Sequence, residues 1–512
     1  MQEEDMIIQD LFEKRTQLMV NCLRYIYQSN SFVTIVNLSE RLNVNRKTTD
    51  SILNELQKIN PQAIKIKKAL GCSFSGNKNI YFDIQHEIYN QSVIYQVIEN
   101  CLLSKRIKIE EFCELNYISL SNLRKKFHCI NRSLQRFELK IGTKNRRIVI
   151  EGSESQIRYF GHSFFWTICK GGQWPYPELN YAHIRELFVQ RILPNFDFQL
   201  KQSIVDKWCY LIAINILRDK KGNRLKMEEM PQWSINMTQD LFEKEFQNIK
   251  DSFFQYSFFR DESIYFLFLM MQTSTQFYAK KATYKQIIDF WEREKAEVYL
   301  EAVSLSEKLT LPLNGGNEKN VFGILLAAHS FYDAFEGFLE VGSDSDIIRY
   351  YRHYYPVLVN KIRTICFGNT TGQLTEKQEF LLLRYVLAYT SLITPTLFEK
   401  KIVVSVETDF PFSFEQFFIM QLKKIFSALY NIDFIAAESL VEEPDIIISN
   451  TYQNRSAIYM SGAIDSLEIE RLTKKIESIR REHILQENVI VFSQQVVSAV
   501  FENHESAKDI SV

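Results

Sequence analysis

The chain has 512 residues, of which 46% are hydrophobic and 13% aromatic, and its formal net charge is −1. That length is too great for one hydrophobic core, so we expect roughly three to five domains, and the apolar content excludes a disordered chain. Only 16 Gly and 10 Pro are present, which disfavours turn-rich β architecture and predicts a mainly α multidomain protein.

The sequence lacks the signals of a membrane or secreted protein. No uninterrupted apolar run reaches the ~18 residues of a membrane span, and the first residues, MQEEDMIIQD, are acidic where a secretory signal is basic. The 8 Cys lack CxxC spacing, which fits reduced thiols better than disulfides or a zinc site. We therefore expect a cytoplasmic protein with no metal or other cofactor and no membrane partner.

The charge is unevenly distributed along the chain. Residues 1–150 hold 23 Lys and Arg against 15 Asp and Glu, a net charge of +8, so the remaining 362 residues carry −9. A basic end on an acidic body is typical of a protein that contacts nucleic acid with one end only. Two solvated basic helices would produce the same imbalance, so charge alone does not decide between them.

One local pattern occurs twice in the basic end. A helix is predicted over 14–28. The segment 36–56 follows it and begins with a short amphipathic stretch that contains Leu38 and Leu42, then continues with a polar turn and a longer basic segment. The segment 107–134 repeats this with Phe112 and Leu115, behind a helix predicted over 88–103. Basic, β-prone stretches follow at 64–82 and 139–150 and would form wings. The pattern predicts two tandem winged helix-turn-helix motifs, in which the second helix presents polar and basic side chains to a DNA groove.

The candidate DNA contacts lie on the two second helices and in the wings, because the N-terminal end of such a helix enters the major groove. On the first helix they are Asn45, Arg46, Lys47, Thr48 and Thr49. On the second they are Ser119, Ser121, Asn122, Arg124 and Lys125, continued by Lys126, Arg132 and Arg136. The wings add Lys65, Lys67, Lys68, Lys140, Lys144, Arg146 and Arg147. Arg and Asn suit base edges, whereas Ser, Thr and Lys more often contact phosphates.

Beyond residue 150 the sequence changes character twice. Ser153, Glu154 and Ser155 should cap a helix, and helical patterns continue to about residue 395, with breaks at 220–224, 311–319 and 367–373. The central break leaves two similar halves, which indicates a duplicated all-α domain. The last ~110 residues alternate strands (401–406, 432–437, 445–450 and 489–493) with helices (414–429 and 467–479), which predicts a small parallel α/β domain.

The segment LRKKFHCINRSLQRFELKIGTKNRRIVIEG and the following SESQIRYFGHSFFW resemble the Mga/AtxA-like regulators of Gram-positive bacteria. The resemblance implies two winged helix-turn-helix domains (1–84 and 85–152), two all-α PTS-regulation-like domains (153–283 and 284–397) and a C-terminal EIIB-like α/β domain (398–512). It also implies a transcriptional regulator that binds double-stranded promoter DNA, an activator of virulence or carbohydrate-responsive genes, and not an enzyme. A homodimer, PTS phosphocarrier proteins and RNA polymerase are the partners that it implies.

Regulation in this family implies phosphorylation of histidines in the PTS-regulation domains. Of four matching positions only His329 is a histidine, because the others are Cys209, Leu269 and Arg384. His329 is therefore the candidate phosphoacceptor, with His353 or an ordinary packed histidine as the alternatives. The EIIB-like domain has Ser405 and no Cys in its first strand, which excludes cysteine phosphotransfer and leaves dimerisation as its role.

Three other functions remain open at the level of sequence. An RNA-binding antiterminator also carries PTS-regulation domains, but it begins with a small β-rich domain. A catalytic C-terminal domain lacks support, since no nucleophile elbow, P-loop, GxGxxG or metal-ligand cluster is present. An interaction scaffold whose winged helices bind protein is the third alternative.

Overall fold

The computed structural model describes residues 11–29, 31–68, 70–196, 200–278, 281–309, 321–337, 344–368, 373–441, 443–452 and 456–487. The chain is mainly helical and forms two compact units, one of residues 1–347 and 370–388 and the other of residues 348–369 and 389–512. None of the described helices has the length and apolar composition needed to cross a membrane. The finer division into five domains stays a prediction. The break predicted at 311–319, residues 369–372 of the break predicted at 367–373, and the strand predicted at 489–493 lie outside the described residues.

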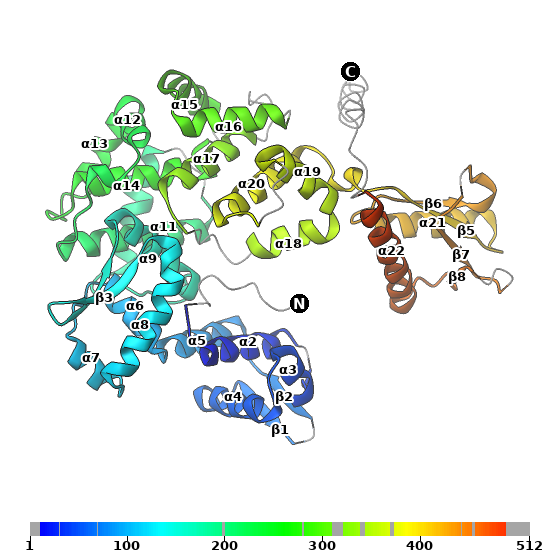
Figure 1. Cartoon of the computed structure of the whole chain (residues 1–512), viewed down its shortest axis with the longest axis horizontal. Coiled ribbons are helices and arrows are strands. Elements are labelled where there is room, and N and C mark those ends of the chain that lie inside the picture. The colour runs from blue at the N-terminus through cyan, green and yellow to red at the C-terminus, as the bar shows by residue number, and fades with distance from the viewer. Residues whose placement is uncertain are drawn as a thin grey trace. The chain divides into compact units, whose positions relative to one another are not determined.

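The first unit begins with two modules, each a helix-turn-helix followed by a two-stranded antiparallel hairpin (Figure 1). The elements of the first module are α2 (Lys14–Gln28), α3 (Ile35–Leu42), α4 (Arg46–Ile59), β1 (Ile64–Lys67) and β2 (Gly71–Phe74). Those of the second are α5 (Lys78–Asn90), α6 (Val93–Leu102), α7 (Ile109–Leu115), α8 (Leu120–Leu134), β3 (Lys140–Lys144) and β4 (Arg147–Glu151). The predicted tandem motifs and the helix over 14–28 are confirmed as elements.

Two predicted boundaries in this region are wrong. The first hairpin ends at Phe74, whereas the predicted wing ran to residue 82. A new helix begins after Asn77, whose side chain caps it by accepting from the backbone N–H of Asn79 and Ile80. The helix predicted over 88–103 is likewise two helices, because α5 ends at Asn90 and α6 starts after Ser92.

Helices build the rest of the first unit and the start of the second. They are α9 (Glu154–Cys169), α10 (Tyr181–Glu186), α11 (Gln202–Lys220), α12 (Gln232–Leu241), α13 (Glu243–Ser252), α14 (Asp261–Gln272), α15 (Lys281–Glu294), α16 (Glu297–Lys308), α17 (Val321–Ala334), α18 (Asp344–Tyr354), α19 (Pro356–Phe367) and α20 (Glu376–Leu392). Ser153 caps α9 as predicted, since its hydroxyl accepts from the backbone N–H of Gln156. Helix α14 ends at Gln272, and a short 3₁₀ turn, Thr275–Tyr278, follows.

A buried ionic cluster fixes α9 to α11. The Arg158 guanidinium bonds the carboxylates of Glu154 (2.9 Å) and Asp219 (2.6 Å). Arg218 bonds Glu154 at 2.6 Å and 2.8 Å and also donates to the carbonyls of Cys101 and Leu102 at the end of α6. Burial alone would raise the pKa of Glu154, but Arg218 and then Arg158 outweigh it and hold that pKa below its usual value. The cluster therefore joins the second module to the helical region through paired charges.

The C-terminal part of the second unit is an α/β fold with a four-stranded parallel sheet in the order β6-β5-β7-β8. Its elements are β5 (Ile402–Glu407), α21 (Phe412–Phe426), β6 (Ile432–Ala436), β7 (Ile446–Ser449), β8 (Ile458–Tyr459) and α22 (Ser466–Glu487). One apolar core joins Val404 and Ile448 of the sheet with Leu422 of α21 and Leu472 of α22. The predicted small parallel α/β domain is confirmed over the described residues.

We expect Glu154→Gln to lower the free energy of unfolding by about 3–5 kcal/mol, because it leaves Arg158 and Arg218 buried with one carboxylate fewer. Urea denaturation followed by tryptophan fluorescence measures the change. Because the pKa of Glu154 is lower in the folded chain, its contribution is present at neutral pH and is lost as the pH falls through the folded pKa.

Glu178→Gln is the matched control. Glu178 pairs with Lys220 at 3.0 Å on an exposed surface, where such a pair contributes about 0–1 kcal/mol. Equal losses in the two variants would contradict a stabilising role for the buried cluster.

Candidate functional site

The two helix-turn-helix turns have the same backbone geometry, each residue of the first matching the residue seventy-four positions later. Asn43 and Tyr117 both adopt left-handed conformations, with φ of 50° and 51°. Val44 and Ile118 then donate to the carbonyls of Ser39 and Cys113, each at 3.0 Å. This repetition makes α4 and α8 equivalent second helices.

Asn45 and Ser119 are the N-caps of these helices. The Asn45 side chain accepts from the backbone N–H of Thr48 at 2.9 Å, and the Ser119 hydroxyl accepts from that of Asn122 at 3.2 Å. Both satisfy a helix N-terminus that would otherwise have unpaired donors. Their observed role is structural, and direct DNA contact by either stays a prediction.

Thr49 is wrong as a candidate DNA contact. Its side chain is 0% exposed, and its hydroxyl lies 2.9 Å from that of Ser39, which braces α4 against α3. The equivalent residue in the second module is Leu123, a core position. The periodicity of Ile52, Leu53 and Leu56 contains this signal, because Thr49 continues their buried face.

The exposed surfaces of α4 and α8 differ in charge. On α8, Ser121, Asn122, Arg124, Lys125 and Arg132 are exposed, and the helix contains no Asp or Glu. On α4, Arg46 and Lys47 are exposed beside Asp50, and Glu55 pairs with Arg15 at 2.5 Å. The second module therefore offers the more positive surface. The opposite, apolar face of α8 is buried and consists of Leu123, Phe127, Ile130 and Leu134.

Three of the predicted cations on and after α8 already pair with carboxylates. Lys126 pairs with Glu13 at 2.5 Å, and Glu13 also accepts from the hydroxyl of Ser92. Arg136 pairs with Glu376 at 3.0 Å, and Arg146 with Glu110 at 3.0 Å. Lys126 is a half-buried link between α8 and the start of α2, so we remove it from the candidate contacts.

The wings are held to their helices by amide side chains. Asn131 of α8 both donates to the carbonyl of Ile141 (2.8 Å) and accepts from its N–H (2.7 Å). Gln57, the equivalent residue of α4, donates to the carbonyl of Ile64 at 3.3 Å. The wing cations project from this fixed base and are exposed: Lys65, Lys67, Lys68, Lys140, Lys144, Arg146 and Arg147.

The turn of the second module exposes large apolar side chains that sequence reasoning missed. Tyr117 is 97% exposed and Leu115 64% exposed. Leu115 was expected to brace the second helix, but the repeat matches it to the exposed Arg41 and matches the buried Leu42 to Asn116. Aligning the two sequence segments at an offset of seventy-four residues would have placed Leu115 at the exposed position of Arg41.

Comparison with known proteins shows what the second module is similar to. The Mga helix-turn-helix domain matches residues 81–165, which span the second module and the start of α9. The anthrax toxin expression trans-acting positive regulator of Bacillus anthracis is 26% identical over 217 residues, which are 42% of this chain and 44% of that protein. The chain is a relative of the Mga/AtxA-like regulators. The match to the curated relative spans less than half of either chain.

In this Mga relative the candidate phosphoacceptor His329 is buried. Its side chain is 1% exposed, its Nε2 lies 2.8 Å from the Tyr385 hydroxyl, and its Nδ1 lies 3.6 Å from a carboxylate oxygen of Glu301. The nearby His329 ring lowers the pKa of Glu301. A donor protein cannot reach this ring unless α17 separates from α16 or α20.

The other positions aligned with regulatory histidines have separate environments. Cys209 and Leu269 are fully buried. Arg384 lines a cavity, and burial lowers the pKa of its guanidinium to about 10. The alternative histidine, His353, is exposed on α18 beside the ring of Tyr354.

The residues that follow α17 and the first residue of α20 contact α9 and the end of the second module's α8. The Gln156 amide donates to the Glu336 carbonyl at 2.6 Å, just after α17. Gly337 has a φ of 65°, and a Cβ there would lie 2.2 Å from the Phe137 ring. With the Arg136–Glu376 pair, these contacts hold the end of α8 against both helices.

The C-terminal α/β fold has an apolar surface along α21. Phe412 is 78% exposed, and Phe414, Phe417 and Met420 are also exposed. Ser405 is buried within β5. Among the described residues, no cluster of His, Cys, Asp and Glu has the arrangement of a metal site.

Proposed function

We propose that the protein is a DNA-binding transcriptional regulator in which α8 is the main recognition helix. The observation that carries the proposal is the exposed face of α8, which presents Arg124, Lys125 and Arg132 with no carboxylate on the helix. This helix lies inside the segment that matches the Mga helix-turn-helix domain. Since the relative's name describes a positive regulator, we propose activation as the direction of control.

The geometry suits insertion of α8 into a major groove. Ser121, Asn122 and Arg124 lie in its first two turns, where this motif contacts base edges, and Arg and Asn are the side chains that read guanine and adenine. Lys140 and Lys144 project from the wing that Asn131 fixes to the helix, which suits phosphate contacts. The first module supplies a second, less positive contact with DNA through Arg46, Lys47 and the β1/β2 wing.

We expect Arg124→Ala with Lys125→Ala to raise the Kd for a promoter fragment by at least about tenfold, because a base contact and a phosphate contact are lost. Fluorescence anisotropy on the full chain measures it. If six phosphates are neutralised in the complex, log K should fall with log salt with a slope of about −5.

The matched variant is Arg46→Ala with Lys47→Ala, which we expect to have the smaller effect because Asp50 already offsets the charge of α4. An equal increase in Kd for the two double variants would contradict the ranking of the two modules. Absence of binding by the unaltered protein at low salt would contradict the function and favour a protein-binding scaffold.

We further propose that the helical regions are two PTS-regulation-like domains and that His329 accepts a phosphoryl group from PTS phosphocarrier proteins. The Glu301 carboxylate near Nδ1 supports this, because it can orient the ring and leave Nε2 as the nucleophile once Tyr385 moves away. Burial of the ring makes the reaction dependent on opening of α17, so we expect slow labelling.

Incubation with phosphoenolpyruvate and purified PTS proteins should label the unaltered chain and His353→Ala but not His329→Ala. Mass spectrometry locates the label. Because His353 is exposed on α18, its variant controls for labelling of accessible histidines. Label that persists in His329→Ala and disappears in His353→Ala would reassign the site.

The C-terminal fold supports a proposal of homodimerisation through an EIIB-like domain. The apolar stripe of Phe414, Phe417 and Met420 on α21 suits the same surface of a second copy. The exposed Tyr117 turn of the second module supports RNA polymerase as a further protein partner.

We expect Phe414→Asp with Phe417→Asp to convert a dimer to a monomer in size-exclusion chromatography with light scattering, because two charges would be buried in the interface. Leu467→Asp, at an exposed position of α22, is the control and should leave the mass unchanged. A dimer that persists in the double variant would contradict dimerisation through α21.

A further inference from the structure

A second basic segment lies outside the helix-turn-helix modules. Residues 220–226, at the end of α11 and just after it, read KKGNRLK and contain no Asp or Glu. We call this segment the α11 loop. Because the 362 residues after position 150 carry a net charge of −9, the loop is a positive exception within an acidic region. Such a local reversal of charge is a candidate contact for an anionic partner.

The α11 loop packs against the chain that leads into α7. The Arg106 guanidinium donates to the Lys221 carbonyl at 3.0 Å, and the Asn223 amide donates to the Ser104 hydroxyl at 2.7 Å. Arg158 of the buried ionic cluster donates to the Asn223 carbonyl at 3.1 Å. The loop is therefore held in a defined place beside the second module.

The chain that leads into α7 also contacts the wing of the second module. The Arg147 guanidinium donates to the Arg106 carbonyl, and Lys108 forms a β-bridge with Arg147. The backbone N–H of Ile109 donates to the Arg146 carbonyl at 2.8 Å. Hydrogen bonds thus join the wing, the chain before α7 and the α11 loop, in that order, into one surface.

This surface is positive along its whole length. Within the α11 loop Leu225 is buried, whereas Arg224 and Lys226 on either side of it are exposed. Lys220 and Lys221 share one carboxylate partner. Over the described residues, the cations of this surface that are exposed and have no carboxylate partner are Arg106, Lys108, Lys144, Arg147, Arg224 and Lys226. Positive charge therefore continues across the boundary between the second module and the helical region.

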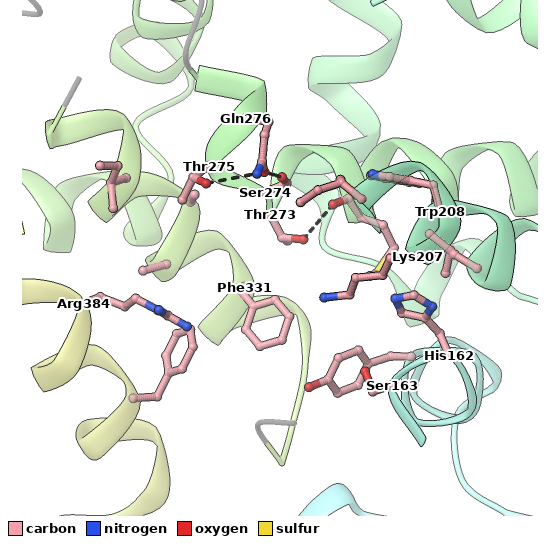
Figure 2. A pocket seen from close by; sticks show the side chains of 18 residues that line it. His162, Ser163, Lys207, Trp208, Thr273, Ser274, Thr275, Gln276, Phe331 and Arg384 are labelled. Atoms are coloured by element: carbon pink, nitrogen blue, oxygen red, sulfur yellow. Dashed lines mark hydrogen bonds between the residues drawn. The ribbon is translucent and has the colours of Figure 1, made fainter. Parts of the chain in front are cut away.

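Other cations of the first unit are enclosed. Lys207 and Arg384 line the cavity among α9, α11, α17 and α20, where they are half-buried and lie on opposite sides of Phe331 (Figure 2). A nucleic acid cannot enter a cavity of about 270 Å³. The surface beside the wing, by contrast, is open to a large partner.

We propose that the α11 loop extends the DNA contact of the second module, with Arg224 and Lys226 binding phosphates of the duplex beyond the wing. This inference rests on the proposed function, because it takes the wing as a DNA contact. Duplex DNA carries one negative charge per about 1.7 Å of its axis, so a cationic surface that continues from the wing meets further phosphates. Such contacts fix position and add affinity without reading sequence. The helical region then binds DNA together with the modules.

Fluorescence anisotropy of the full chain on a random-sequence duplex of about four helical turns tests the proposal, since phosphate contacts need no particular operator. We expect Arg224→Gln with Lys226→Gln to raise the Kd at least about fivefold at low salt. The slope of log K against log salt should become less steep by about 2, because each phosphate contact contributes about 0.9 to it. Arg224→Lys, which keeps the charge, should bind like the unaltered chain.

Lys285→Gln with Lys308→Gln is the matched control, because both lysines are exposed, on α15 and α16, and the variant removes the same charge. Thermal unfolding verifies the fold of each variant. If the unaltered chain binds but the Arg224 and Lys226 double variant has the Kd and salt slope of the control, the proposal is overturned and the DNA-binding function stands. Failure of the unaltered chain to bind the duplex at low salt would overturn both.

Discussion

The buried charges of Glu154, Arg158, Arg218 and Asp219 are the constraint on which the arrangement of the first unit depends. Each guanidinium is paired with a carboxylate, so no charge of this group is buried alone. Arg218 also satisfies two carbonyls at the end of α6, where helix carbonyls otherwise lack partners. The cluster thus fixes the second helix-turn-helix module to the helical region by geometry that apolar packing alone would not specify.

The two modules share a backbone and differ in chemistry. Their turns and caps match residue for residue, and Gln57 and Asn131 occupy equivalent positions from which each bonds its wing, which indicates one structural solution used twice. Side chains of α4 are partly occupied by contacts within the module, since Glu55 binds Arg15 and Ser39 binds Thr49. Those of α8 leave more positive charge exposed. A tandem arrangement of unequal modules can combine one affinity-determining contact with one that sets spacing along the DNA.

Local signals in the sequence were sufficient for most elements. Ser153 marks the start of α9 because a capping hydroxyl acts on residues three positions away, and the β-branched run at 402–406 marks β5. Apart from the two wrong boundaries on either side of α5, the errors concern tertiary contacts. Lys126 could not be assigned to Glu13 because their pairing joins segments over a hundred positions apart, and the exposure of Leu115 depends on which turn position it occupies. The cavity was not predicted for the same reason, since its lining comes from five separate parts of the chain.

Helices α17 and α20 take part in three features at once. They form the His329–Tyr385 contact, they supply Phe331 and Arg384 to the cavity, and their ends meet Gln156 and Arg136 beside α8. Any change that parts these two helices therefore alters all three places together. Because Arg136 directly follows α8, a rearrangement of this helix pair reaches the cationic helix without an intermediate element.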